Sequence, residues 1–135
     1  LEKIKQIASN QFYCSLIIPD SLCQIDYYTS LREYCLDNYQ IKEIIELGDG
    51  VFDEAVVPTI IFSFKNKDTN YQNEVLIGNE NAIIKNSFYS KIKQDYYYKT
   101  PKKSFNLHLD NLAIRLQSLI DNTIYRKLSD VVPDD

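Results

Sequence analysis

Three short apolar runs in the first half of the chain constrain its fold more than any other feature. They cover residues 12–18, 41–47 and 56–64, and each is rich in β-branched and aromatic side chains, which favour β-strands. The first run is nearly continuous and ends at Pro19, a pattern typical of a strand buried on both faces inside a parallel sheet. Residues 24–39 carry apolar side chains at helical spacing, which predicts an amphipathic crossover helix between the first two strands.

This order of strand, helix, strand, strand predicts an α/β protein in which the helix connects two parallel strands. The third strand can run antiparallel to the second. Pro58 lies near its start, where a missing N–H is tolerated, and residues 65–73 form a polar loop after it. Because three strands and one helix cannot cover both faces of a parallel sheet, we expect the missing strands to lie upstream of Leu1.

The second half of the chain predicts shorter elements. Residues 74–77 and 82–84 are candidate strands, and residues 86–94 could form one or two helical turns. Asp110 is a favourable helix N-cap. The residues that trace one face of the helix after it are Leu112, Ala113, Leu116, Leu119 and Ile120.

The length of 135 residues suggests about one domain. With 44% hydrophobic and 25% charged residues the chain is too apolar to be disordered. The net charge of −4 divides unevenly, since residues 1–64 hold 4 basic and 10 acidic side chains and residues 65–135 hold 11 and 9. A polyanion should therefore meet the second half. No apolar run approaches the ~20 residues of a membrane span, and no secretion signal is visible, so we expect a soluble, intracellular protein.

The cysteines and the histidine argue against a disulfide framework and a metal site. Cys14, Cys23 and Cys35 lie in apolar segments without paired spacing, so we interpret them as reduced core residues. His108 is the only histidine, and a zinc site would need an unusual ligand set. We therefore expect no bound metal. The chain also lacks Met altogether, which suggests a piece of a longer protein.

One segment combines basic and aromatic residues. Residues 91–103 contain five Lys, one Asp and the run Tyr96 to Tyr98, a combination typical of nucleic-acid contact. The alternative is a solvated linker whose tyrosines cover the edge of the domain. The residues predicted to contact DNA phosphates, on the ground of charge alone, are Lys91, Lys93, Lys99, Lys102 and Lys103.

No complete catalytic signature is present, so catalysis by this chain alone is not expected. Asp49, Asp53 and Glu54 surround the Gly48/Gly50 turn and could bind a cation or act in acid/base chemistry. The alternative is a solvated loop between two strands, because the spacing fits no standard Ca²⁺ loop.

Residues 47–62 read Leu-Gly-Asp-Gly-Val-Phe-Asp-Glu-Ala-Val-Val-Pro-Thr-Ile-Ile-Phe. This segment resembles the C-terminal part of the methyltransferase domain of adenine-specific, N6-forming DNA methyltransferases of type I and type IIG restriction-modification systems. Residues 12–22 are similar to the strand-Ile-Pro-x-Ser-Leu segment of that family, and residues 31–36 to its Leu-Arg-x-x-Leu-Leu helix. The resemblance covers roughly residues 9–65 in the same order and spacing.

A further resemblance concerns the end of the chain. Phe105-Asn106-Leu107, the helix after Asp110 and residues 127–132 are similar to the family's connector into the target-recognition domain. The resemblance therefore implies that residues 1–72 are the C-terminal part of a Rossmann-like methyltransferase domain and that residues 73–135 form a mixed α/β or helical connector.

The resemblance also implies the activity of the longer parent protein, a bacterial, cytoplasmic enzyme. The parent would transfer a methyl group from S-adenosylmethionine to adenine N6 in double-stranded DNA, together with a restriction or specificity subunit or domain. The catalytic Asn/Asp-Pro-Pro-Tyr/Phe tetrapeptide and the glycine-containing S-adenosylmethionine loop of the family are absent from this chain. The piece alone should therefore neither bind the cofactor nor methylate DNA, and it holds no catalytic or cofactor-binding residue.

In the family, the aromatic residue of the Leu-Gly-x-Val-Phe loop packs against the target adenine after the base has been flipped out, and Phe52 occupies that position. Such stacking is worth about 1–3 kcal/mol per base. Pro58 and Thr59 would frame the same wall. Without the flanking pattern, Phe52 would be interpreted as a loop aromatic that folds onto the core.

A second class of function is a non-catalytic α/β interaction or scaffold domain. The chain contains 11 tyrosines, a residue type enriched at protein interfaces. A third interpretation is that the tyrosines cover surfaces left bare by truncation.

Overall fold

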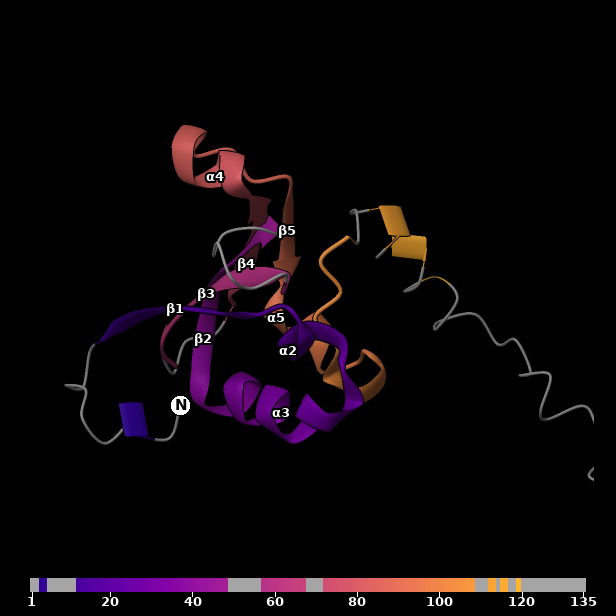
Figure 1. Cartoon of the computed structure of the whole chain (residues 1–135). Helices are drawn as coiled ribbons and strands as arrows, with labels where there is room; N and C mark the ends of the chain where they lie inside the picture. The colour runs from indigo at the N-terminus through magenta and orange to yellow at the C-terminus, as the bar shows by residue number, and fades with distance from the viewer. Residues whose placement is uncertain are drawn as a thin grey trace, which may run out of the picture.

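The computed structural model describes residues 3–4, 12–48, 57–67 and 72–108, as well as Leu112, Ala113, Arg115, Leu116 and Leu119. These residues form a five-stranded sheet of order β1-β3-β2-β4-β5 (Figure 1). The strands are β1 (Tyr13–Pro19), β2 (Tyr39–Gly48), β3 (Thr59–Asn66), β4 (Glu74–Asn79) and β5 (Ser90–Lys93).

The sheet is mixed. β3 lies between β1 and β2 and runs antiparallel to both, so β1 and β2 are parallel to each other. β2 pairs in parallel with β4, and β4 pairs antiparallel with β5. The predictions of an α/β fold, of parallel first and second strands and of an antiparallel third strand are confirmed. β2 and β3 continue slightly beyond the ends expected for them, to residues 48 and 66.

The predicted crossover helix between β1 and β2 is three helical segments: α2 (Ser21–Gln24), the 3₁₀-helix η1 (Asp26–Tyr28) and α3 (Thr29–Asn38). The break falls at Ile25, whose backbone is extended (φ −67°, ψ 132°). The guanidinium of Arg32, fully buried on α3, donates hydrogen bonds to the carbonyls of Leu22 at 2.8 Å and Ile25 at 2.9 Å. Arg32 thereby holds the separate segments together.

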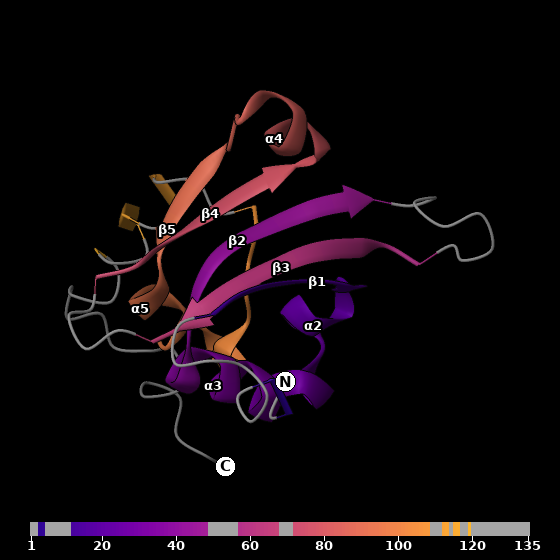
Figure 2. The same ribbon diagram turned by 90° about the vertical axis from the view of Figure 1, so that its left-hand side faces the viewer.

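The core lies between the helices and one face of the sheet (Figure 2). Its residues on β3 alternate along the strand, as expected for a strand with one face in the core, whereas on β2 a bulge between Ile41 and Glu43 shifts the next core residue to Ile44. Cys23 and Cys35 are buried in this core, as the sequence predicts, and all three cysteines are free thiols. The fully buried sheet and connector residues are Tyr39, Ile41, Ile44, Ile60, Phe62, Phe64, Val75, Ile77, Ile92 and Phe105.

The prediction that the first strand is buried on both faces is wrong. β1 is an edge strand that pairs only with β3 among the described residues, and its side chains alternate between exposed and half-buried. Cys14, Leu16 and Ile18 face the helices, whereas Tyr13 and Ile17 are 57% and 53% exposed. A continuous apolar run cannot by itself distinguish a central strand from an edge strand, because both hold apolar side chains.

Two expectations for the second half are also wrong. Residues 82–84 belong to the helix α4 (Glu80–Lys85) and not to a strand. The side chain of Asn79 accepts a hydrogen bond from the backbone N–H of Asn81 at 3.0 Å and so caps α4. The segment expected to form helical turns, residues 86–94, contains β5, which pairs with β4. Tertiary pairing therefore overrides the local pattern.

The remaining described elements are α5 (Gln94–Tyr97) and the 3₁₀-helix η2 (Pro101–Lys103). Five residues of the predicted helix after Asp110 are described, and all five are helical: Leu112, Ala113, Arg115, Leu116 and Leu119. Asp110 and Ile120 lie outside the described residues. The division of the chain at residue 72 stays a prediction. In the described part of the chain, no helix is long and apolar enough to cross a membrane.

Candidate functional site

The carboxyl ends of the three parallel strands lie at one end of the sheet. β1 ends at Pro19, β2 at Gly48 and β4 at Asn79, and β3 begins between the first two of these ends (Figure 2). In open α/β sheets, ligands bind outside the carboxyl ends of the strands. This end of the sheet is therefore the first place where a ligand is expected.

Two of the three predicted base-packing residues lie at this end. Thr59 pairs with Pro19 on one side and with Gly48 on the other. The carbonyl of Pro58 accepts a hydrogen bond from the backbone N–H of Asp20 at 3.0 Å. The structure thus brings together the two strand segments that carry the sequence resemblance, although they are about forty residues apart.

The exposure of the two residues differs. Pro58 is exposed, whereas Thr59 is 7% exposed and its hydroxyl oxygen is buried with no hydrogen-bond partner in the part of the chain that the structure describes. A buried hydroxyl without a partner costs about 1–3 kcal/mol. Phe52, the third predicted base-packing residue, lies outside the described residues, as do Asp49, Asp53 and Glu54.

A polar cluster that the sequence did not predict lies near the same end. The Tyr89 hydroxyl donates to Oε2 of Glu46, and Nε2 of His108 lies 3.3 Å from Oε1 of the same carboxylate. Burial, followed by the hydrogen bond to Glu46, raises the pKa of the Tyr89 hydroxyl. The three residues are far apart in the sequence, and the fold brings them together from β2, from the segment before β5 and from the segment after η2, so no spacing could have indicated the cluster.

Two of the three cysteine thiols, those of Cys23 and Cys35, are not activated as nucleophiles. Burial raises the pKa of the Cys23 and Cys35 thiols to about 12, so both stay protonated at neutral pH. Among the described residues, no group of three or more His, Cys, Asp or Glu side chains could hold a metal ion.

The predicted phosphate-contacting lysines differ in how far they are engaged within the fold. Lys91 and Lys93 are exposed on β5, and Lys99 is exposed beyond α5. Lys102 forms an ion pair with Asp26. The Lys103 ammonium donates to the Tyr98 carbonyl at 2.6 Å and lies 6.0 Å from the centre of the Tyr98 ring. Two of the five lysines are thus engaged within the fold.

The tyrosines of the same tract pack inward. Tyr97 is fully buried, and its ring lies edge-on to Phe105 with the centroids 5.0 Å apart. Tyr96 and Tyr98 are partly buried against the core. Base stacking needs an accessible ring face, so Tyr97 is not available for it in this structure. The Tyr98 hydroxyl also donates to Asp37 at 3.0 Å.

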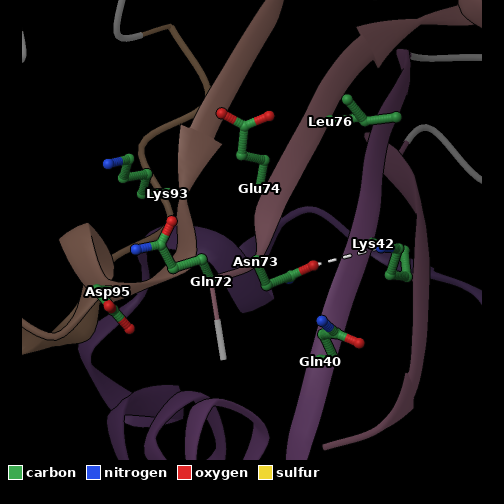
Figure 3. A pocket seen from close by; sticks show the side chains of 8 residues that line it. All are labelled: Gln40, Lys42, Gln72, Asn73, Glu74, Leu76, Lys93 and Asp95. Carbon is green, nitrogen blue, oxygen red and sulfur yellow. Dashed lines mark hydrogen bonds between the residues drawn. The ribbon is translucent and has the colours of Figure 1, made fainter. Parts of the chain in front are cut away.

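A polar pocket of about 450 Å³ lies at the opposite end of the sheet, where the parallel strands begin (Figure 3). Lys93 is the only predicted site residue that lines it. The Lys42 ammonium lies 3.3 Å from Oδ1 of Asn73 across its floor. The lining residues are Gln40, Lys42, Gln72, Asn73, Glu74, Leu76, Lys93 and Asp95.

The inner wall of this pocket is a buried network of carboxamides. Gln94, fully buried, accepts from the Ile41 N–H at 2.9 Å and donates to the Tyr39 carbonyl at 2.9 Å. Its side-chain amide therefore replaces the peptide group of a neighbouring strand where β4 does not reach β2. Asn73 donates to Gln94 at 2.9 Å and to the Ile41 carbonyl. The network satisfies buried backbone groups, which is a structural role.

One pocket residue has an unpaired atom, Oε1 of Gln40, but this atom is buried and a ligand in the pocket does not reach it. The pocket carries two lysines and two carboxylates, so it has no net charge to attract an ion of either sign. It does not add to the case for a DNA-contacting surface. The carboxyl ends of the strands remain the candidate functional site.

Comparison with known proteins adds no family to this picture, because no protein-family model and no curated protein matches the sequence. The residues and the fold therefore carry the functional proposal.

Proposed function

We propose that this chain is the C-terminal part of an adenine-specific, N6-forming DNA methyltransferase domain and that it contributes the wall which packs on the flipped adenine. The parent enzyme would belong to a bacterial restriction-modification system. Its methyl donor, S-adenosylmethionine, would be held by residues outside this chain, because the family's glycine-containing loop is not among these residues. The chain alone would be inactive.

The observation that carries this proposal is the meeting of two matched segments at the carboxyl ends of the parallel strands. The end of β1, with Pro19 and Asp20, contacts the start of β3, with Pro58 and Thr59. The loop that holds Phe52 connects Gly48 to this same start of β3. Support comes from the general placement of ligands at the carboxyl ends of strands in α/β sheets.

The order of elements supports the proposal as well. The resemblance implies strand, helix, strand, strand for residues 9–65, and the described part of that segment has β1, helices, β2 and β3 in this order. The resemblance also implies a connector after this segment. The described residues there form β4, α4, β5, α5 and η2, which agrees with a mixed α/β connector.

The test begins with the reading frame upstream of Leu1. It should encode a Gly-rich strand-to-helix turn followed by Asn/Asp-Pro-Pro-Tyr/Phe. In that full parent, Phe52→Ala should slow methyl transfer to DNA and leave S-adenosylmethionine binding unchanged, because only stacking on the flipped base is removed. A loss of about 1–3 kcal/mol corresponds to roughly a fivefold to 150-fold slower reaction.

The matched control is Tyr27→Ala, which truncates an aromatic that is 87% exposed on η1. It should leave methylation unchanged. Equal activity of the Phe52 and Tyr27 variants would remove Phe52 from the site. A natural start codon near Leu1, with no catalytic motif upstream, would contradict the proposal as a whole.

The scaffold function is the second candidate, and the exposed Tyr13 and Tyr27 are the observation that favours it. Fewer of the 11 tyrosines can contact a partner than the sequence suggests, because Tyr39 and Tyr97 are fully buried. Binding of a protein partner that persists at high salt, without any DNA binding, would favour the scaffold over the methyltransferase proposal.

A further inference from the structure

The helix α4 exposes its largest apolar side chains. Ile83 is 56% and Ile84 is 78% exposed, whereas Ala82, at 4%, is the buried residue of this six-residue helix. A surface helix ordinarily turns its apolar residues to the core and its polar residues to water. Because α4 buries its smallest apolar residue and exposes its two largest, burial in the core does not explain the two isoleucines.

The packing beneath α4 fixes this arrangement. A Cβ on Gly78 would lie 2.5 Å from the Cβ of Ala82 and 3.1 Å from Cδ1 of Phe88, so α4 approaches β4 this closely only because residue 78 is a glycine. The side chain of Asn79 caps the first turn, and Asn86, in the left-handed region (φ 50°), ends the helix. The helix is therefore held on the sheet and at both of its ends with the isoleucines outside.

The position of α4 places it beside the candidate functional site. It follows the carboxyl end of β4 and contacts β2 as well as β4, and Figure 2 shows it beside the arrowhead of β4. β2 alone separates β4 from β3, which begins at Thr59. Neighbouring strands are about 4.8 Å apart, so β4 lies about 10 Å from β3. The isoleucines are therefore near the proposed base-packing wall without belonging to it.

This position does not compete with the strands expected upstream of Leu1. Both sides of β2 and of β4 are occupied, whereas β1 pairs only with β3 among the described residues. Additional parallel strands would therefore extend the sheet beside β1, on the opposite side of the sheet from α4.

The charge around α4 favours a polyanion as its partner. Lys85 is the last residue of α4, and Lys91 and Lys93 are exposed on β5, which pairs with β4. Residues 80–93 hold these three lysines and one acidic residue, Glu80, which gives a net charge of +2 in a chain whose net charge is −4. Basic side chains supply the affinity for DNA phosphates. Exposed Ile is among the apolar residues that DNA-binding proteins insert between base steps.

We propose that Ile84, supported by Ile83, enters the base stack of duplex DNA beside the flipped adenine, while Lys91 and Lys93 contact the phosphates. Flipping a base leaves a gap and costs the stacking of its neighbours. An aliphatic side chain that fills the gap keeps those neighbours apart. The choice of DNA as the partner rests on the proposed function, and the new element is the helix that would hold the duplex open.

The experiment measures the affinity of this chain for two duplexes of the same sequence, of which one is intact and the other has a single abasic position. Fluorescence anisotropy of the labelled duplexes at low salt gives the two dissociation constants. Because the abasic duplex already contains a gap, the chain should bind it about tenfold more tightly. The double variant Ile83→Ala/Ile84→Ala should lose this preference. Ile84→Leu keeps an apolar side chain of similar size and should retain it.

The matched control is Ile25→Ala, which truncates the same residue type at a position that is 52% exposed in the crossover. It should retain the preference for the abasic duplex. Alanine favours helix more than isoleucine does, so circular dichroism should show that the double variant folds like the original chain. Lys91→Ala should weaken the binding of both duplexes by the same factor, since phosphate contacts carry no information about the bases.

Three results would overturn the inference. They are the absence of binding to either duplex at low salt, equal affinity for both duplexes, and a preference that the double variant retains. The measurement needs neither the cofactor nor methyl transfer. A chain with the expected preference and a parent that does not methylate DNA would refute the proposed function alone. A parent that methylates DNA, together with a chain that shows no preference, would refute the role of α4 alone.

Discussion

The two ends of the parallel strands β1, β2 and β4 differ in how their polar side chains are bonded. At the amino end, the side-chain amides of Gln94 and Asn73 fill the gap between β2 and β4 and pair with buried backbone groups. Each end also holds a buried polar atom with no hydrogen-bond partner among the described residues, Oε1 of Gln40 at the amino end and the Thr59 hydroxyl at the carboxyl end. There the Tyr89 hydroxyl donates a hydrogen bond to Glu46, and His108 lies within 3.3 Å of the same carboxylate.

Under the proposed function, this difference gives the polar groups at the amino end a structural role and those at the carboxyl end a role in binding. The network at the amino end is buried, and its members pair with one another and with the backbone. Two strands can therefore separate there while their backbone groups keep hydrogen-bond partners. The carboxyl end keeps polar groups near the surface, where the ends of several strands come together. We therefore assign stability to the amino end and binding to the carboxyl end, and the following measurements test that assignment.

The largest effect is expected at the amino end. Gln94→Ala leaves the Ile41 N–H and the Tyr39 carbonyl without their side-chain partner and should lower the free energy of unfolding by about 3 kcal/mol. Urea unfolding measures the change. Gln72→Ala removes an exposed carboxamide from the same pocket and should change stability by less than about 0.5 kcal/mol. Equal effects would show that the network does not hold this end together.

The pH dependence compares a buried tyrosine near the amino end with a half-exposed one near the carboxyl end. Burial is the main cause that raises the pKa of Tyr97 and of Tyr89. Between about pH 10, the ordinary pKa of tyrosine, and the raised pKa, the unfolded chain loses phenol protons that the folded chain keeps. Stability should therefore be unaffected by these groups below about pH 10 and should fall as the pH rises above it.

Urea unfolding across this alkaline range tests the two residues separately. Tyr97→Phe should reduce the loss of stability by about 1.4 kcal/mol per pH unit, the value for one proton. Tyr89→Phe should reduce it by less, because Tyr89 is 48% exposed and water screens the interaction with Glu46. If Tyr89→Phe reduced the alkaline loss of stability more than Tyr97→Phe, the assignment of stability to the amino end would be contradicted.

A smaller effect of opposite sign is expected at Thr59. Thr59→Val replaces a buried hydroxyl that has no partner with a methyl group of similar shape and should raise the free energy of unfolding by about 1 kcal/mol. Thr59→Ser keeps the hydroxyl, removes the methyl group and should lower stability instead. If Thr59→Val is destabilising, the Thr59 hydroxyl has a hydrogen-bond partner. The carboxyl end would then depend on hydrogen bonds of buried side chains, as the amino end does.

The smallest effect concerns DNA binding by the parent enzyme and follows from the proposed function. Lys91→Ala and Lys93→Ala each remove an exposed charge from β5 and should reduce the slope of log affinity against log salt by about 0.9 for each phosphate that the lysine neutralises. Lys102→Ala removes a charge that is paired with Asp26 and should leave the slope nearly unchanged. Equal slopes for all three variants would remove Lys91 and Lys93 from the phosphate-contacting set.

The sequence predicted the central elements well because their local patterns and their tertiary roles agree. Residues 41–47 and 56–64 are rich in β-branched and apolar side chains. The first segment lies within β2, and the second overlaps β3. Residues 82–84 have similar composition but form part of α4, because Asn79 caps a helix immediately before them. Short apolar segments are ambiguous until their neighbours are known.

The base-packing role of Pro58 and Thr59 stays a prediction, and what the sequence anticipates is their position at one end of the sheet. Pro58 and Thr59 lie at the carboxyl ends, as a ligand wall requires, since the order of strands alone places the start of β3 there. Glu46, Tyr89 and His108 were missed because contacts between distant strands leave no periodic signal in the sequence. The basic tract at 91–103 was identified from charge, but only the structure shows that Lys102 and Lys103 are engaged within the fold.

By itself the sequence determined the α/β class, the order of the first strands and helix, and the reduced state of the buried cysteines, because these depend on local pattern and composition. The tertiary structure decided that β1 is an edge strand, that Gln94 completes the sheet beside β2, and which tyrosines and lysines remain accessible. These features depend on which distant segments become neighbours. Pairing and burial are properties of the whole packed chain, and a single segment does not encode them.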